Sequence, residues 1–160
     1  EWINAAHYLC GNERGTMALV SKGAMHGVWF GFNADKLLIR VDTEGGPARD
    51  RLAEVGALRV GFIEPANCEV VITHPGSPRP LGSVNPAIDT NRNGTAVEAA
   101  CGKILELAVP FAKLGVVPGD SLKFYVELLV EDASVDRAPR EGIFELTVPS
   151  PDFERIMWQV

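Results

Sequence analysis

Apolar and polar residues alternate with a period of two along most of this chain. In the segment Leu122–Glu131 every second residue is apolar and the residues between them are mainly polar, and Lys36–Asp42 follows a similar pattern. This alternation is typical of a β-strand with one buried face. Further predicted strands are Thr16–Ser21, Gly27–Phe32, Leu58–Glu64, Cys68–Thr73, Gly94–Cys101, Ile104–Pro110 and Phe144–Val148.

Helical periodicity is scarce in the sequence. A short helix is predicted at Pro47–Val55, between a proline start and a glycine stop, and a single turn at Phe111–Leu114. Because no helix follows each strand, a parallel sheet of βαβ units is excluded as the main architecture. The strands are separated by Gly/Pro turns, and Asn33-Ala34-Asp35 is a predicted hairpin connection. We expect an all-β, antiparallel β-sandwich with very little helix, with a closed barrel as the alternative.

Residues 1–160 are expected to form one domain. The polar stretch His74–Gly94 is interpreted as a long exposed loop. The chain begins with Glu1 and shows no signal-peptide pattern, so we interpret it as a piece of a longer polypeptide.

The charge balance excludes some partners. The chain has 15 Lys and Arg against 21 Asp and Glu, a net charge of −6, and no basic stretch. Nucleic acids and anionic membranes are bound through clustered Lys and Arg, so we expect neither as a partner. No apolar run is long enough to span a bilayer.

The three cysteines, Cys10, Cys68 and Cys101, are far apart and form no CxxC pair. We expect free thiols in a reducing compartment, and hence a cytoplasmic location, with one disulfide plus a free thiol as the alternative. The sequence contains no motif of a hydrolase, nucleotide-binding loop or zinc site, so no catalytic residue and no cofactor is predicted.

The aromatic residues suggest a binding surface. In the predicted strand Gly27–Phe32, Trp29 lies on the face opposite to Val28 and Phe30, next to Gly31. A flat indole ring in this position can stack on the C–H face of a sugar, and Asn33 and Tyr125 are candidate neighbours. The alternative is that Trp29 is covered by a loop or a neighbouring domain, because Trp is on average highly buried.

Several segments together resemble the C-terminal β-domain of glycoside hydrolase family 57 proteins, which are α-amylases, α-mannosidases or 4-α-glucanotransferases. The pattern of Ile104–Phe111 with Leu114-Gly115 and Pro118–Asp120 also resembles the type 9 carbohydrate-binding-module-like sandwiches of the DOMON superfamily, so the resemblance implies a carbohydrate-binding-module-like or immunoglobulin-like sandwich. The segments that carry the resemblance are Glu1-Trp2, Met25-His26, Trp29–Asn33, Leu37–Asp42, Ile104–Phe111 with Leu114-Gly115 and Pro118–Asp120, Arg137–Gly142, Leu146–Pro149, Phe153 and Trp158.

The resemblance implies a non-catalytic accessory domain, because the catalytic residues of family 57 lie in an upstream barrel that no segment of this chain matches. Its partner would be the catalytic barrel of the parent chain, which it would pack on and stabilise. The candidate interface residues are Trp2, Tyr8, Phe153, Ile156 and Trp158. One alternative is a carbohydrate-binding module that contacts an α-glucan through Trp29, Asn33 and Tyr125, and a second is a free-standing enzyme.

The segment Asp89–Gly94 partly matches a calcium-binding loop. Asp89, Asn91 and Asn93 occupy positions 1, 3 and 5, and Gly94 occupies position 6. Position 12 is Ala100 instead of the bidentate glutamate, so Glu98 would have to supply the missing carboxylate. The segment is therefore interpreted as either a calcium-binding loop or an ordinary turn, because Asp, Asn and Gly are common turn residues.

Overall fold

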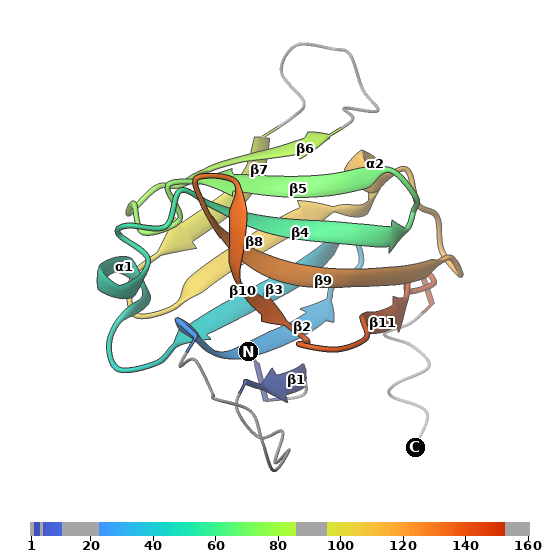
Figure 1. Cartoon of the computed structure of the whole chain (residues 1–160). Helices are drawn as coiled ribbons and strands as arrows, with labels where there is room; N and C mark the ends of the chain where they lie inside the picture. Colours follow the sequence, from blue (N-terminus) through green and yellow to red (C-terminus); the bar gives the residue numbers. More distant parts are fainter. Residues whose placement is uncertain (1, 4, 11–22, 86–95, 153–160) are drawn as a thin grey trace.

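The computed structural model describes residues 2–3, 5–10, 23–85 and 96–152, and these form an antiparallel all-β fold (Figure 1). The two helices, α1 (Ala48–Arg51) and α2 (Phe111–Leu114), are short. The strands of this part of the chain are β1 (Ala6–Leu9), β2 (Met25–Phe32), β3 (Lys36–Thr43), β4 (Ala57–Glu64), β5 (Cys68–Thr73), β6 (Leu81–Asn85), β7 (Ala96–Cys101), β8 (Leu105–Pro110), β9 (Ser121–Val130), β10 (Ala133–Ala138) and β11 (Phe144–Thr147).

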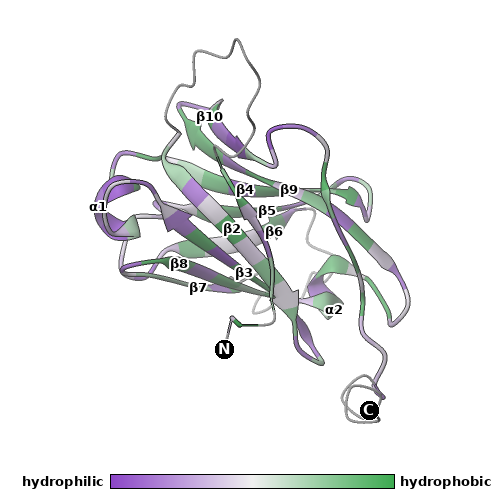
Figure 2. Cartoon of the chain, turned by 90° about the horizontal axis from the view of Figure 1, so that it is seen from below, coloured by the Kyte–Doolittle hydropathy of each residue, from purple (hydrophilic) through white to green (hydrophobic). Residues whose placement is uncertain are grey.

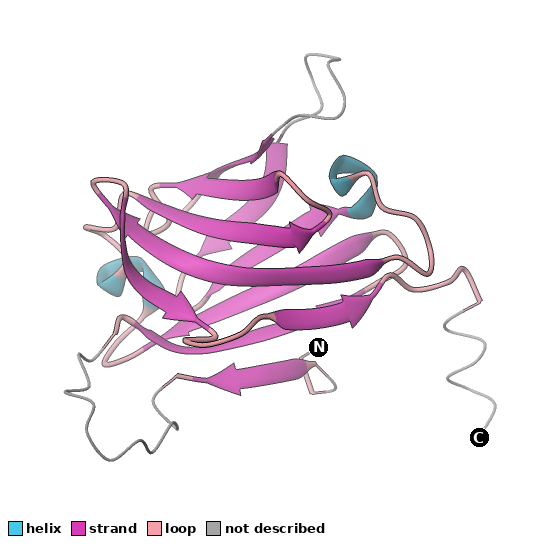
Figure 3. Cartoon of the chain, turned by 45° about the vertical axis from the view of Figure 1, so that its right-hand side comes forward, coloured by secondary structure: helices cyan, strands magenta, loops and turns pink. Residues whose placement is uncertain are grey.

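The strands form one continuous, barrel-like sheet. Their hydrogen-bonded order is β1-β2-β3-β8-β7-β6-β5-β4-β9-β10, and β11 also pairs with β9. Figure 3 shows the strands curving around one interior, with the two short helices at its ends. The predicted all-β, antiparallel class is therefore confirmed. Two separate sandwich sheets are not confirmed, because β6 and β7 pair through Gly82–Val97 and Ser83–Ala96. This pairing joins one half of the sheet, made of β1, β2, β3, β8 and β7, to the other half, made of β6, β5, β4, β9, β10 and β11.

The alternation in the sequence places one face of each main strand in the core. In β3, Leu37, Ile39 and Val41 are fully buried, and the residues between them lie on the outer face. Hydrophobic and hydrophilic colours accordingly alternate along several strands (Figure 2). Phe124 of β9 packs against Phe30 of β2, with ring centroids 5.4 Å apart, and so joins the two halves of the sheet.

The sheet closes between β10 and β2 through a side chain rather than a backbone ladder. The Asp136 carboxylate of β10 accepts one hydrogen bond from the backbone N–H of Met25 (2.8 Å) and one from its neighbour Arg137 (2.9 Å). A Cβ at Gly23 would overlap this carboxylate, so the glycine allows the close approach. Each strand carries a register shift at this position, which re-aims its backbone groups.

Most predicted strands are confirmed within a few residues, but three strands were not predicted. β6 lies inside His74–Gly94, so the prediction of one long loop is wrong for Leu81–Asn85. Only Val84 of β6 is buried, which leaves little alternation to detect. β1 has four residues, and the register shift in β10 interrupts its period. The prediction at Thr16–Ser21 lies outside the described residues.

The closure by Asp136 predicts a measurable contribution to stability. Asp136→Asn keeps the size of the side chain but removes its charge and one of its two acceptor oxygens. Hydrogen bonds to charged groups contribute about 1.5–3 kcal/mol, so we expect a loss of about 1–3 kcal/mol in the free energy of unfolding in urea. The control is Asp50→Asn in the exposed helix α1, expected to change stability by no more than about 0.5 kcal/mol. Equal effects of the two variants would contradict the proposed closure.

Candidate functional site

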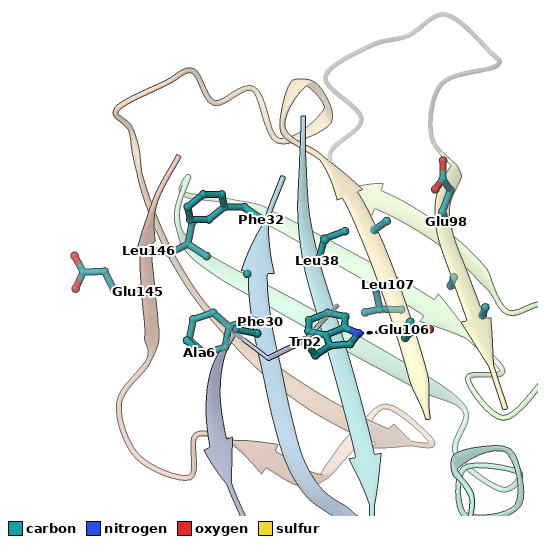
Figure 4. Close-up of a pocket in the computed structure, with 15 residues that line it drawn as sticks. Trp2, Ala6, Phe30, Phe32, Leu38, Glu98, Glu106, Leu107, Glu145 and Leu146 are labelled. Carbon is teal, nitrogen blue, oxygen red and sulfur yellow. Dashed lines mark hydrogen bonds between the residues drawn. The ribbon is translucent and has the colours of Figure 1, made fainter. Parts of the chain in front are cut away.

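A groove of about 680 Å³ crosses the outer face of β2, β3, β8 and β7 and continues around the end of β2 towards β11 (Figure 4). Its volume falls within the usual range for small-molecule sites. The lining is mostly apolar, with three glutamates. The residues that line it are Trp2, Ala5, Ala6, Phe30, Gly31, Phe32, Leu38, Glu98, Ala99, Ala100, Glu106, Leu107, Ala108, Glu145 and Leu146.

The floor of the groove is a row of small and apolar residues on neighbouring strands, with a glutamate at the β7 end. Gly31 of β2 pairs with Leu38 of β3, Leu38 pairs with Ala108 of β8, and Ala108 pairs with Glu98 of β7. All four lie on the outer face, opposite to the buried residues of the same strands. A Cβ at Gly31 would meet only the Cβ of Ala5, at 3.9 Å, so space is open above this position.

The adjacent row of the same strands carries aromatic and charged side chains and forms a wall beside the floor. Trp29 pairs with Arg40, and Arg40 pairs with Glu106. The Arg40 guanidinium lies over the Trp29 ring, 4.8 Å from its centroid, and donates two 2.7 Å hydrogen bonds to Asp42. The bond to Asp42 raises the pKa of Arg40, and the negative charge of Glu106 adds to this increase.

Trp2 comes from the start of the chain and lies over this face of the sheet (Figure 4). Its indole Nε1–H donates a 2.9 Å hydrogen bond to Oε1 of Glu106. The bond satisfies the one polar group of the indole and fixes the ring beside the floor of the groove. Glu106 points away from Leu105, Leu107 and the core, as its position in the alternation predicts.

The three carbohydrate-binding candidates from the sequence are not brought together. Trp29 lies on the predicted outer face, but it is partly buried and contacts both Arg40 and His7, whose ring is stacked with its centroid 6.1 Å away. The Oδ1 atom of Asn33 accepts hydrogen bonds from the backbone of the β2–β3 turn. Tyr125 lies on β9, on the other half of the sheet, beneath the Arg137 guanidinium at 4.6 Å.

The candidate residues for an interface with a catalytic barrel also lie in different places. Trp2 lines the groove, whereas Tyr8 points towards the core, where its ring contacts Phe144 with centroids 5.8 Å apart. The Tyr8 hydroxyl accepts a 3.3 Å hydrogen bond from the backbone N–H of Arg140. The remaining candidates of the sequence-based interface, Phe153, Ile156 and Trp158, lie outside the described residues.

Of the four predicted calcium ligands, Asp89, Asn91 and Asn93 lie outside the described residues. Glu98 lies in β7, where its carboxylate forms an ion pair with the Lys36 ammonium group at 2.9 Å. Among residues 2–3, 5–10, 23–85 and 96–152, no group of three or more His, Cys, Asp or Glu side chains is placed to hold a metal ion.

A charged cluster on the other half of the sheet was missed by the sequence reasoning. Glu127 of β9 is only 8% exposed, and its carboxylate accepts hydrogen bonds from the Arg59 guanidinium. Arg137 lies 3.8 Å from the same carboxylate and donates to the backbone carbonyl of Gly142 (3.0 Å). Because these charges compensate each other, we interpret the cluster as structural. Neither this cluster nor the Trp2–Glu106 bond has a local sequence signal, since the partners are far apart in the chain.

No family model, curated protein or solved structure matches this chain. In the described part of the chain, neither helix has the length and apolar character needed to cross a membrane.

The cysteines differ in accessibility, and this predicts an order of chemical reactivity. No disulfide joins these three cysteines, and Cys68 and Cys101 are 7% and 8% exposed, so burial raises the pKa of both thiols. The thiolate is the reactive form, so iodoacetamide at neutral pH should modify the less buried Cys10 at least about tenfold faster than either. Peptide mass spectrometry over time measures the order, and urea should abolish it. Equal rates in the native protein would contradict this arrangement of the cysteines.

Proposed function

We propose that this chain is a non-catalytic carbohydrate-binding accessory domain and that the groove is its binding site. The observation that carries this proposal is the position of Trp2, anchored to Glu106 beside a floor of small residues. Concave, largely apolar sites with a few placed polar groups are where proteins bind small molecules.

The chemistry of the groove suits a saccharide. A pyranose ring has an apolar C–H face and a rim of hydroxyl groups. The indole of Trp2 and the Gly31–Leu38–Ala108 row supply apolar surface, and the carboxylates of Glu98, Glu106 and Glu145 supply hydrogen-bond acceptors for hydroxyl groups. The bond to Glu106 holds the Trp2 ring before a ligand arrives, which lowers the entropic cost of binding.

The resemblance to family 57 C-terminal domains supports the same class of ligand. It implies a parent enzyme that processes an α-glucan, with catalysis in a separate barrel. The proposed role of this chain is then to hold substrate near that barrel rather than to cleave it. This assigns binding to Trp2 and the groove instead of to the combination of Trp29, Asn33 and Tyr125.

The binding site can be tested with maltohexaose in isothermal titration calorimetry. Trp2→Ala removes the aromatic contact and should weaken binding about tenfold or more, because burying such a side chain contributes roughly 1.5–3 kcal/mol. Gly31→Val fills the floor at a position where a Cβ meets no close neighbour, so it should block binding while the fold is retained. Tyr125→Phe, on the other half of the sheet, is the matched control and should bind like the unmodified chain.

Unchanged affinity in both Trp2→Ala and Gly31→Val, with a native circular dichroism spectrum, would exclude the groove as the saccharide site. A loss of binding in Tyr125→Phe alone would return the site to the other half of the sheet.

A second candidate function is docking of this face onto the catalytic barrel of a parent chain. The observation in its favour is that Ile3, the residue after the groove-lining Trp2 in the sequence, is 94% exposed. Hydrogen exchange distinguishes the two functions. Docking predicts that β7 and β8 are more strongly protected in the parent protein than in this chain alone, without saccharide. Carbohydrate binding predicts that maltohexaose increases the protection of these strands in the isolated chain.

A further inference from the structure

We propose that the groove selects its ligand by charge. It accepts saccharides that are uncharged or carry amino groups, and it rejects those that carry carboxylate, phosphate or sulfate groups. The inference rests on the proposed function, since it names the class of saccharide that the same groove would take.

The first observation is the placement of the three glutamates along the groove. Glu145 lies at the β11 end, Glu106 beside Trp2, and Glu98 at the β7 end (Figure 4). Among the described residues, the lining contains no Lys, Arg or His side chain. An anionic ligand that occupies the centre of the groove beside Trp2 therefore comes near the Glu106 carboxylate.

The second observation is that two of these carboxylates form no direct ion pair, although Arg40 and Lys123 lie close enough to interact electrostatically with Glu106 and Glu145. Glu98 is paired with Lys36, at 2.9 Å. Within the described residues, Glu106 and Glu145 form no ion pair. The partner of Glu106 is the indole N–H of Trp2, a neutral donor.

The nearest cations are already engaged by other carboxylates. Arg40, which pairs with Glu106 across the strands, is bound in a bidentate manner by Asp42. Lys123, opposite Glu145 in the β9–β11 pair, donates a 3.0 Å hydrogen bond to Glu64. A ligand anion thus gains no free cation from the described part of the lining, and it meets repulsion that is stronger near a low-dielectric surface than in water. The carboxylates still accept hydrogen bonds from hydroxyl groups, and they attract an ammonium group.

The experiment compares three ligands with one backbone: maltohexaose, maltohexaose oxidised to carboxylates at C6, and its 6-amino-6-deoxy derivative. Calorimetry at low salt should show binding of the neutral and amino forms, and at least tenfold weaker binding of the carboxylate form. The difference in affinity between the neutral and the carboxylate form should decrease in 0.5 M NaCl, because salt screens the repulsion.

Two variants assign the selectivity to the groove. Glu106→Gln keeps an oxygen that can accept the Trp2 N–H and removes the charge, so the ratio of neutral to carboxylate affinity should fall severalfold, and further in the double variant with Glu145→Gln. Glu54→Gln, at an exposed residue outside the groove, makes the same change in net charge and should leave the ratio unaltered.

The failures of the inference and of the proposed function are distinguishable. If none of the three saccharides binds, the proposed function is wrong and the inference is overturned with it. If maltohexaose binds but the carboxylate form binds as tightly, only the charge selection is wrong. The charge selection is also wrong if the affinity ratio is unchanged in the Glu106→Gln, Glu145→Gln double variant, or if it falls equally in Glu54→Gln.

Discussion

The cross-strand register of β2, β3, β8 and β7 is the constraint on which the other features depend. Successive residues of a strand point to opposite faces, so a slip of one residue would exchange every buried side chain with an exposed one. The burial of Leu37, Ile39 and Val41 in β3 fixes this register through the hydrophobic effect. The same register aligns Gly31, Leu38 and Ala108 on the outer face. The core and the groove are thus two consequences of one alignment.

On the outer face of β2, β3, β8 and β7, the groove lies where the side chains are small. The outer row through Trp29, Arg40 and Glu106 is filled by long side chains, of which Trp29 and Arg40 contact each other, whereas the next row through Gly31 and Ala108 leaves space. The bulky residues find partners within the fold: the Trp29 ring lies against Arg40, and its edge reaches within 2.8 Å of the position of a Cβ at Gly27. The empty row, not the row with the most conspicuous aromatic residue, is therefore the part of this face that can receive a ligand.

The fold was more predictable than the site, for a physical reason. A strand that buries one face leaves a local period of two, and β5 and α2 were predicted with the bounds that the structure has. β6 was missed because it buries only Val84 and contains Gly82, where a Cβ would lie 2.8 Å from Val97. The site depends on pairs that no local pattern records. The outward direction of Trp29 was correct, but its burial by Arg40 and the contact of Trp2 with Glu106 follow only from the pairing of distant strands.

The pairing of β3 with β8 has a consequence for how the chain folds. This ladder joins residues 36–41 to residues 105–110, and the ladder of β4 with β9 is similarly non-local. Large loops must close before either ladder gains its hydrogen bonds, and β-rich domains of such topology fold in milliseconds to seconds. The groove combines side chains from the start, middle and end of the described chain, so it is complete only when all of these segments have come together. During synthesis, its surface is complete only after β11 has left the ribosome.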